Sequence, residues 1–94
     1  MLTVSARNVK ITPRRASYRE EDLLNCTADG NPSPSYTWRN LGTQEAIADG
    51  PQLALNSTRL DANQRYTIEC IAQNHVDGDL KLSSATVNVK ISGN

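Results

Sequence analysis

The feature that most constrains this chain is an alternation of apolar and polar residues with a period of two. In the segment DLLNCTA, the side chains of Leu24, Cys26 and Ala28 fall on one face of an extended strand. In SYTWRN, Tyr36 and Trp38 share a face in the same way. No segment shows a convincing helical period, so the pattern predicts half-buried strands of an antiparallel β-sandwich.

Three further segments show the same alternation, and two short ones near the start (LTVSA and residues 8–12, NVKIT) are strand candidates. QLAL places Leu53 and Leu55 on one face, with Asn56 on the other. RYTIECIA turns Tyr66, Ile68, Cys70 and Ala72 inward and Arg65, Thr67, Glu69 and Ile71 outward, and ATVNVKI turns Ala85, Val87, Val89 and Ile91 inward. We therefore expect about seven to eight strands in two sheets.

Turn signals separate these segments. GNPSP (30–34) is not expected to continue a central strand, because proline has no N–H for the ladder. NLGTQ and ADGP (48–51) are rich in turn residues, and Asp77-Gly78 predicts a tight hairpin. Residues 58–64 are compatible with one short helical turn.

The core must be built around few large residues, because the chain has one tryptophan, three tyrosines and no phenylalanine. Alternation turns Trp38, Cys26 and Cys70 inward. Two cysteines permit one disulfide without proving it. A bridge between the sheets with the indole packed on it would supply the hydrophobic mass that the core otherwise lacks, so we interpret all three as core residues.

The stretch CTADGNPSPSYTW resembles the immunoglobulin superfamily, and the I-set within it. That pattern runs Cys-x-Ala-x-Gly-x-Pro-x-Pro followed by Trp, and it is matched here by Cys26, Ala28, Gly30, Pro32, Pro34 and Trp38. A second match is CIAQN (70–74), which is similar to the family's Cys-x-Ala-x-Asn. The resemblance implies an immunoglobulin-like sandwich with one disulfide, Cys26–Cys70, between the sheets, and the short interval between the cysteines implies no C″ strand.

The sequence departs from the family at the tyrosine corner. Ile68 stands two residues before the second cysteine, where the family usually has tyrosine, and Gln64 stands where it has aspartate. The nearest tyrosine is Tyr66. The corner hydrogen bond is therefore expected to be absent or rebuilt from Tyr66.

The resemblance implies an extracellular recognition module in a cell-adhesion molecule or cell-surface receptor. Residues 1–94 are interpreted as a single domain cut from a larger multidomain protein, since Met1 leads directly into strand-like sequence. The expected partner is another protein, a like immunoglobulin domain included. The alternative is a structural spacer in an intracellular tandem array of muscle or cytoskeleton, with both cysteines reduced.

Two sequons for N-glycosylation occur, Asn25-Cys26-Thr27 and Asn56-Ser57-Thr58. Alternation places Asn25 and Asn56 on outward faces, so we expect a glycan on at least one of them. The plainer interpretation is a solvent-exposed asparagine.

Two groups of polar residues are candidate binding sites. His75, Val76, Asp77 and Asp79 are assigned to a loop between two strands at one end of the sandwich, where relatives often carry recognition, although an ordinary hairpin is the plainer interpretation.

Arg14 and Arg15 belong to a basic N-terminal segment, a weak candidate for sulfated glycan or an acidic partner. Against this, Glu20, Glu21 and Asp22 follow directly, and a charged edge that resists aggregation is the plainer interpretation.

Other classes of function have little support in the sequence. Ten basic and ten acidic residues cancel, and no stacking aromatics accompany the basic ones, so nucleic-acid binding is not expected. A lone histidine builds neither a catalytic triad nor a zinc centre, and two aspartates make a poor calcium site, so we expect no enzyme, metal or cofactor. No apolar run approaches about 18 residues, so direct membrane insertion is not expected.

Overall fold

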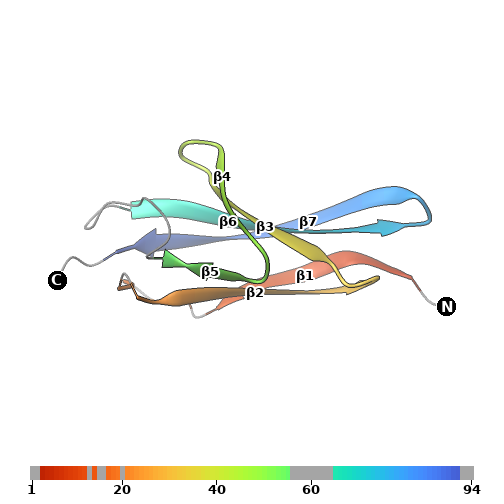
Figure 1. Cartoon of the computed structure of the whole chain (residues 1–94), viewed down its shortest axis with the longest axis horizontal. Helices are drawn as coiled ribbons and strands as arrows, with labels where there is room; N and C mark the ends of the chain where they lie inside the picture. The colour runs from red at the N-terminus through yellow and green to blue at the C-terminus, as the bar shows by residue number, and fades with distance from the viewer. Residues whose placement is uncertain (1–2, 13, 15–16, 20, 56–64, 92–94) are drawn as a thin grey trace.

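The computed structural model describes residues 3–12, 14, 17–19, 21–55 and 65–91, which form two antiparallel sheets packed face to face (Figure 1). The strands in this part of the chain are β1 (Val4–Thr12), β2 (Leu23–Asn31), β3 (Ser35–Asn40), β4 (Glu45–Asp49), β5 (Gln52–Ala54), β6 (Arg65–Val76) and β7 (Asp79–Lys90). The predicted all-β sandwich of about seven to eight strands is confirmed.

One sheet has three strands in the order β1-β2-β5, and the other has four in the order β4-β3-β6-β7. Between β4 and β5 lie only Gly50 and Pro51, so the chain passes from one sheet to the other in two residues. This leaves no room for a further strand after β4, as the short interval between the cysteines predicted.

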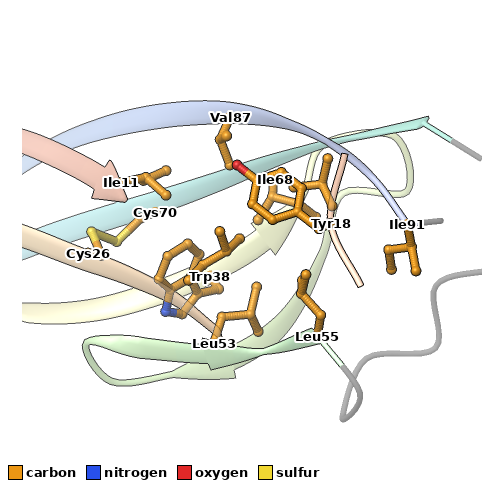
Figure 2. Close-up of a cluster of buried hydrophobic side chains, with 12 residues drawn as sticks. Ile11, Tyr18, Cys26, Trp38, Leu53, Leu55, Ile68, Cys70, Val87 and Ile91 are labelled. Atoms are coloured by element: carbon orange, nitrogen blue, oxygen red, sulfur yellow. A yellow bond between two sulfur atoms is a disulfide. The ribbon is translucent and has the colours of Figure 1, made fainter. Parts of the chain in front are cut away.

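The centre of the core is the predicted disulfide with the indole beside it (Figure 2). Sγ of Cys26 and Sγ of Cys70 are 2.04 Å apart, and the bond joins β2 in one sheet to β6 in the other. Trp38 is fully buried in the same cluster, and its Nε1 donates a hydrogen bond to the carbonyl oxygen of Gly50 at 2.9 Å. The interpretation of all three residues as core is confirmed.

The inward faces follow the alternation in the sequence. The side chains buried together are Ile11, Tyr18, Leu24, Cys26, Trp38, Leu53, Leu55, Ile68, Cys70, Val87, Val89 and Ile91. Ile68 is fully buried, so the position of the usual corner tyrosine is filled by an aliphatic core residue. Tyr66 lies partly buried against the same cluster.

The N-terminal segment differs from the prediction of two short strands. It forms one strand, β1, whose register against β2 shifts twice, and Asn8, at the second shift between Arg7 and Lys10, has a φ of 54°. Asparagine tolerates this left-handed conformation better than most residues, which allows a bulge instead of a break. Farther on, Tyr18 makes a parallel bridge to Ile91, so the segment also reaches the other sheet.

The structure confirms one of the predicted turns and moves the boundary of another. Asp77 and Gly78 form the tight turn between β6 and β7, with φ values of 54° and 84°, as this dipeptide predicts. Asn31 still belongs to β2, so only the part from Pro32 onward lies outside the strand. The helical turn predicted for residues 58–64 lies outside the described residues.

One buried amide connects three segments at the end of the sandwich where β1 begins. Asn74 is 5% exposed, and its Oδ1 accepts a hydrogen bond from the backbone N–H of Ala6 at 3.0 Å. Its Nδ2 donates to the carbonyl oxygens of Val4 and Pro32 at 2.8 and 2.9 Å. A Cβ at Gly30 would lie 3.0 Å from that Nδ2, so the glycine makes room for the amide.

Replacing Asn74 with alanine is expected to lower the free energy of unfolding by about 2–4 kcal/mol, because it leaves the buried N–H of Ala6 and two carbonyls without partners. Urea denaturation measures the change. Gln73→Ala, one residue earlier and facing outward, is the control and is expected to cost less than about 1 kcal/mol. Equal losses in the two variants would contradict the role given to the amide.

Candidate protein-binding face

The outer face of the four-stranded sheet carries an apolar patch near the hairpin between β6 and β7. Leu80 and Leu82 are 50% and 60% exposed, and both lie on β7. They pair with His75 and Gln73 of β6, which face away from the core. Two leucines exposed on one face of one strand contribute little to folding, and contiguous exposed apolar surface marks interaction sites.

Ile71 extends this patch toward the middle of the sheet. It lies on β6 opposite Ser84, and Leu82 is its diagonal neighbour on β7. The two apolar side chains line a shallow hollow of about 250 Å³ together with Ser83 and Ser84. The hollow makes this part of the outer face concave beside Leu82.

A charged pair closes the other side of the hollow. Arg39 of β3 is in register with Glu69 of β6, and Nη1 of the arginine lies 4.0 Å from Oε1 of the glutamate. Nη2 of Arg39 also donates to Oε1 of Gln44 at 2.7 Å, which fixes the guanidinium over the sheet. We call Arg39, Glu69, Ile71, Leu80 and Leu82 the outer patch.

A second open hollow of about 490 Å³ borders the same sheet where β3 begins. Its walls are Pro34, Ser35, Tyr36, Thr37, Asp49, Gly50, Pro51 and Gln73. Thr37 and Gln73 belong to the outward face, so the hollow adjoins the outer patch along β6. Together the two hollows make the outer face uneven, with polar groups around an apolar centre.

The sequence-predicted binding loop is shorter than expected. His75 and Val76 are the last residues of β6, and Asp79 is the first of β7, so only Asp77 and Gly78 form the turn. His75 faces outward beside Leu80, which brings it to the margin of the outer patch. A role of these four residues in binding stays a prediction.

Two described basic residues of the N-terminal segment, Arg14 and Lys10, lie at different places. Nη2 of Arg14 donates to the carbonyl oxygen of Thr86 on β7 at 3.1 Å, whereas Lys10 lines a polar hollow on the three-stranded sheet. Arg15 lies outside the described residues. Sulfated-glycan binding by Arg14 and Arg15 therefore gains no geometric support from the described part of the chain.

Of the two sequon asparagines, Asn25 lies on the outward face of β2 and is half-buried, and Asn56 lies outside the described residues.

Within residues 3–12, 14, 17–19, 21–55 and 65–91, no three His, Cys, Asp or Glu side chains are close enough together to hold a metal ion. No helix in the described ranges is long and apolar enough to cross a membrane.

Sequence reasoning missed Leu80 and Leu82, although the signal was present. Alternation turns Val87 and Ala85 inward, and counting back along the strand places residues 82 and 80 on the opposite face. The last strand was predicted only from Ala85 onward, so the segment DLKL (79–82) was not assigned to it. Outward placement of Glu69 and Ile71 was predicted and is confirmed by their register.

Comparisons with known proteins agree with this geometry. A model of the immunoglobulin domain family matches residues 4–91. Contactin-6 of Rattus norvegicus is 38% identical over 65 residues, which is 62% of this chain and 6% of the relative. Contactin-6 of Homo sapiens is 36% identical over 63 residues, or 60% and 6% of the two chains. The chain thus spans a small part of the curated relatives it matches.

Two solved structures are similar over nearly the whole chain. One is a crystal structure of Dpr11 IG1 bound to DIP-gamma IG+IG2, with a TM-score of 0.71, 25% identity, and coverage of 98% of this chain and 50% of that one. The other, of DIP-gamma IG1+IG2, has a TM-score of 0.62, 26% identity, and coverage of 95% and 50%.

If the outer patch serves binding and not folding, Leu80→Ala combined with Leu82→Ala should change the free energy of unfolding by less than about 1 kcal/mol. Leu53→Ala, at a fully buried position, is the matched control and should cost about 2–5 kcal/mol. Denaturant unfolding of the three proteins measures both. A large loss in the double variant would assign these leucines to the stability of the hairpin.

Proposed function

Since the chain belongs to the immunoglobulin domain family, we propose that it is an extracellular recognition module of a cell-adhesion molecule or cell-surface receptor. It is one non-catalytic domain of a longer multidomain protein, and it binds another immunoglobulin-like domain through the outer patch. The observation that carries the proposal is the exposure of Leu80 and Leu82 on the outer face of a sheet whose other face contributes Trp38, Ile68, Cys70, Val87 and Val89 to the core.

The chemistry of the outer patch suits a protein partner. Protein interfaces have an apolar centre and a polar rim, and here Ile71, Leu80 and Leu82 are bordered by Arg39 and Glu69. Arg39 offers a hydrogen-bond donor and Glu69 an acceptor. A partner with one negative and one positive side chain can therefore pair with both, leaving neither charge unpaired. Shallow hollows of this kind suit side chains of a partner domain better than a buried small ligand.

The likeness to the solved complex supports an immunoglobulin-like partner. In that structure one immunoglobulin domain is bound to a protein with others, and the similarity covers 98% of this chain. The disulfide supports the extracellular setting, since such bonds persist in oxidising compartments. Binding by a single module is expected to be weak and to gain strength from several modules acting together.

Leu82→Arg tests the binding face. A multimeric fusion of the chain is applied to a panel of secreted immunoglobulin-domain proteins that includes the chain itself. The arginine is expected to weaken binding to any partner at least tenfold, because it places an unpaired charge in the apolar centre. Surface plasmon resonance measures the ratio.

The control for this experiment is Leu23→Arg, which changes a leucine that is 45% exposed on the outer face of the other sheet. Binding by this variant is expected to stay within twofold of the unmodified chain. If Leu23→Arg removes binding and Leu82→Arg does not, the interface lies on the three-stranded sheet and the assignment to the outer patch is wrong.

The extracellular setting is tested on protein isolated from its native source. Intact mass with and without reductant should show Cys26 and Cys70 oxidised, with a mass gain of two hydrogen atoms on reduction. Free thiols in the unreduced sample would instead favour the structural spacer in an intracellular array.

A further inference from the structure

The outer face of the three-stranded sheet has a different chemistry from the outer patch. At its centre is Asn25 of β2, in register with Thr12 of β1 and with Gln52 of β5. Asn25 begins the sequon Asn25-Cys26-Thr27, and Thr27 is exposed on the same face. The cysteine between them points to the opposite side and forms the core disulfide.

We infer that Asn25 carries an N-linked glycan that covers this face and leaves the outer patch as the free protein-binding surface of the domain. The inference rests on the proposed extracellular function, because glycan is added only to chains that enter the secretory pathway. It goes beyond that function by assigning a modification site and a role to the second sheet.

The hydrogen bonding of Asn25 leaves the reacting atom available. Its Oδ1 accepts a hydrogen bond from Nε2 of Gln52 at 3.0 Å. Its Nδ2 has no bond to the described part of the chain. A sugar on Nδ2 therefore displaces no hydrogen bond among the described residues, and the bond from Gln52 is made to the oxygen of the amide and not to its nitrogen.

The surface beside Thr27, the third residue of the sequon, suits the sugars of a glycan. A polar hollow of about 430 Å³ lies along β1 and β2, with Asn8, Lys10, Thr27, Ala28 and Asp29 as its walls. Nδ2 of Asn8 donates to Oδ2 of Asp29 at 2.9 Å, which orders these side chains. Hydroxyl and acetamido groups of a sugar find both donors and acceptors there.

The glycan also explains why an apolar residue, Leu23, is exposed on this sheet. This leucine is two residues before Asn25 on the same face of β2, and it is 45% exposed. It is the exposed large apolar side chain of the described residues that the outer patch does not include. The apolar face of a sugar ring on Asn25 can cover it, since alternate residues of a strand are close neighbours.

Transfer of the oligosaccharide to Asn25 exchanges one bond at the anomeric carbon for another. Nδ2 of Asn25 attacks the anomeric carbon of an oligosaccharide that is linked to a lipid pyrophosphate. The N–C bond forms, the C–O bond to the pyrophosphate breaks, the lipid pyrophosphate leaves, and Nδ2 loses one proton. Because Asn25 is half-buried at the centre of a sheet, the transfer takes place on the extended chain before the disulfide closes.

The test uses the full 94-residue chain, secreted from eukaryotic cells with Asn56→Gln so that one sequon remains. Treatment with peptide N-glycosidase is expected to lower its mass by one core glycan and to convert Asn25 into aspartate in the tryptic peptide. Thr27→Ala should remove the glycan, although Asn25 and its bond to Gln52 are kept. Thr27→Ser should retain it.

The second readout is binding. The glycan lies on the sheet opposite the outer patch, so Thr27→Ala should change binding to the partner from the panel by less than twofold. A chain that is secreted and oxidised but carries no sugar on Asn25 would overturn the inference and leave the proposed function intact. A tenfold change in binding on loss of the glycan would overturn the division of roles between the two faces.

Discussion

The contact between the disulfide and the indole of Trp38 is the constraint on which the rest of the domain depends. Closing a loop over a sequence separation of 44 residues stabilises the fold by about 4 kcal/mol in the chain-entropy estimate. This is a large share of the roughly 5–15 kcal/mol that a domain normally has. With no phenylalanine in the chain, the indole is the largest side chain available to fill the space beside that bond.

The two-residue passage between the sheets serves the same core. Gly50 and Pro51 connect β4 to β5, and their carbonyl oxygens accept hydrogen bonds from Trp38 Nε1 and from the backbone N–H of Cys26 at 2.9 and 2.7 Å. The segment that crosses from one sheet to the other thus holds both the indole and one end of the disulfide. A longer connection would leave these polar groups to be satisfied by other partners.

Much of this could be predicted from sequence because it depends on alternation, a local property. The inward faces of β2, β3, β6 and β7, the positions of Cys26, Cys70 and Trp38, and the turn at Asp77-Gly78 all follow from neighbouring residues. What could not be predicted depends on partners far apart in the chain. Asn74 is 70 residues from Val4, and nothing local in the sequence shows that the two are hydrogen-bonded. The outer patch was predicted in part: Arg39, Glu69 and Ile71 were placed outward by alternation, whereas Leu80 and Leu82 were missed because the last strand was predicted only from Ala85 onward.

The same alternation that buries the core also positions the outer patch. Arg39 follows Trp38, and Glu69 and Ile71 stand on either side of Cys70, so each of these outward side chains is next to a residue of the rigid centre. A disulfide and a packed indole restrain the backbone at these positions, so the points from which these side chains project are set before a partner arrives. Preorganisation of this kind lowers the entropy cost of binding. Under the proposed function, the disulfide therefore contributes to recognition as well as to stability, although it lies on the opposite side of the sheet from the outer patch.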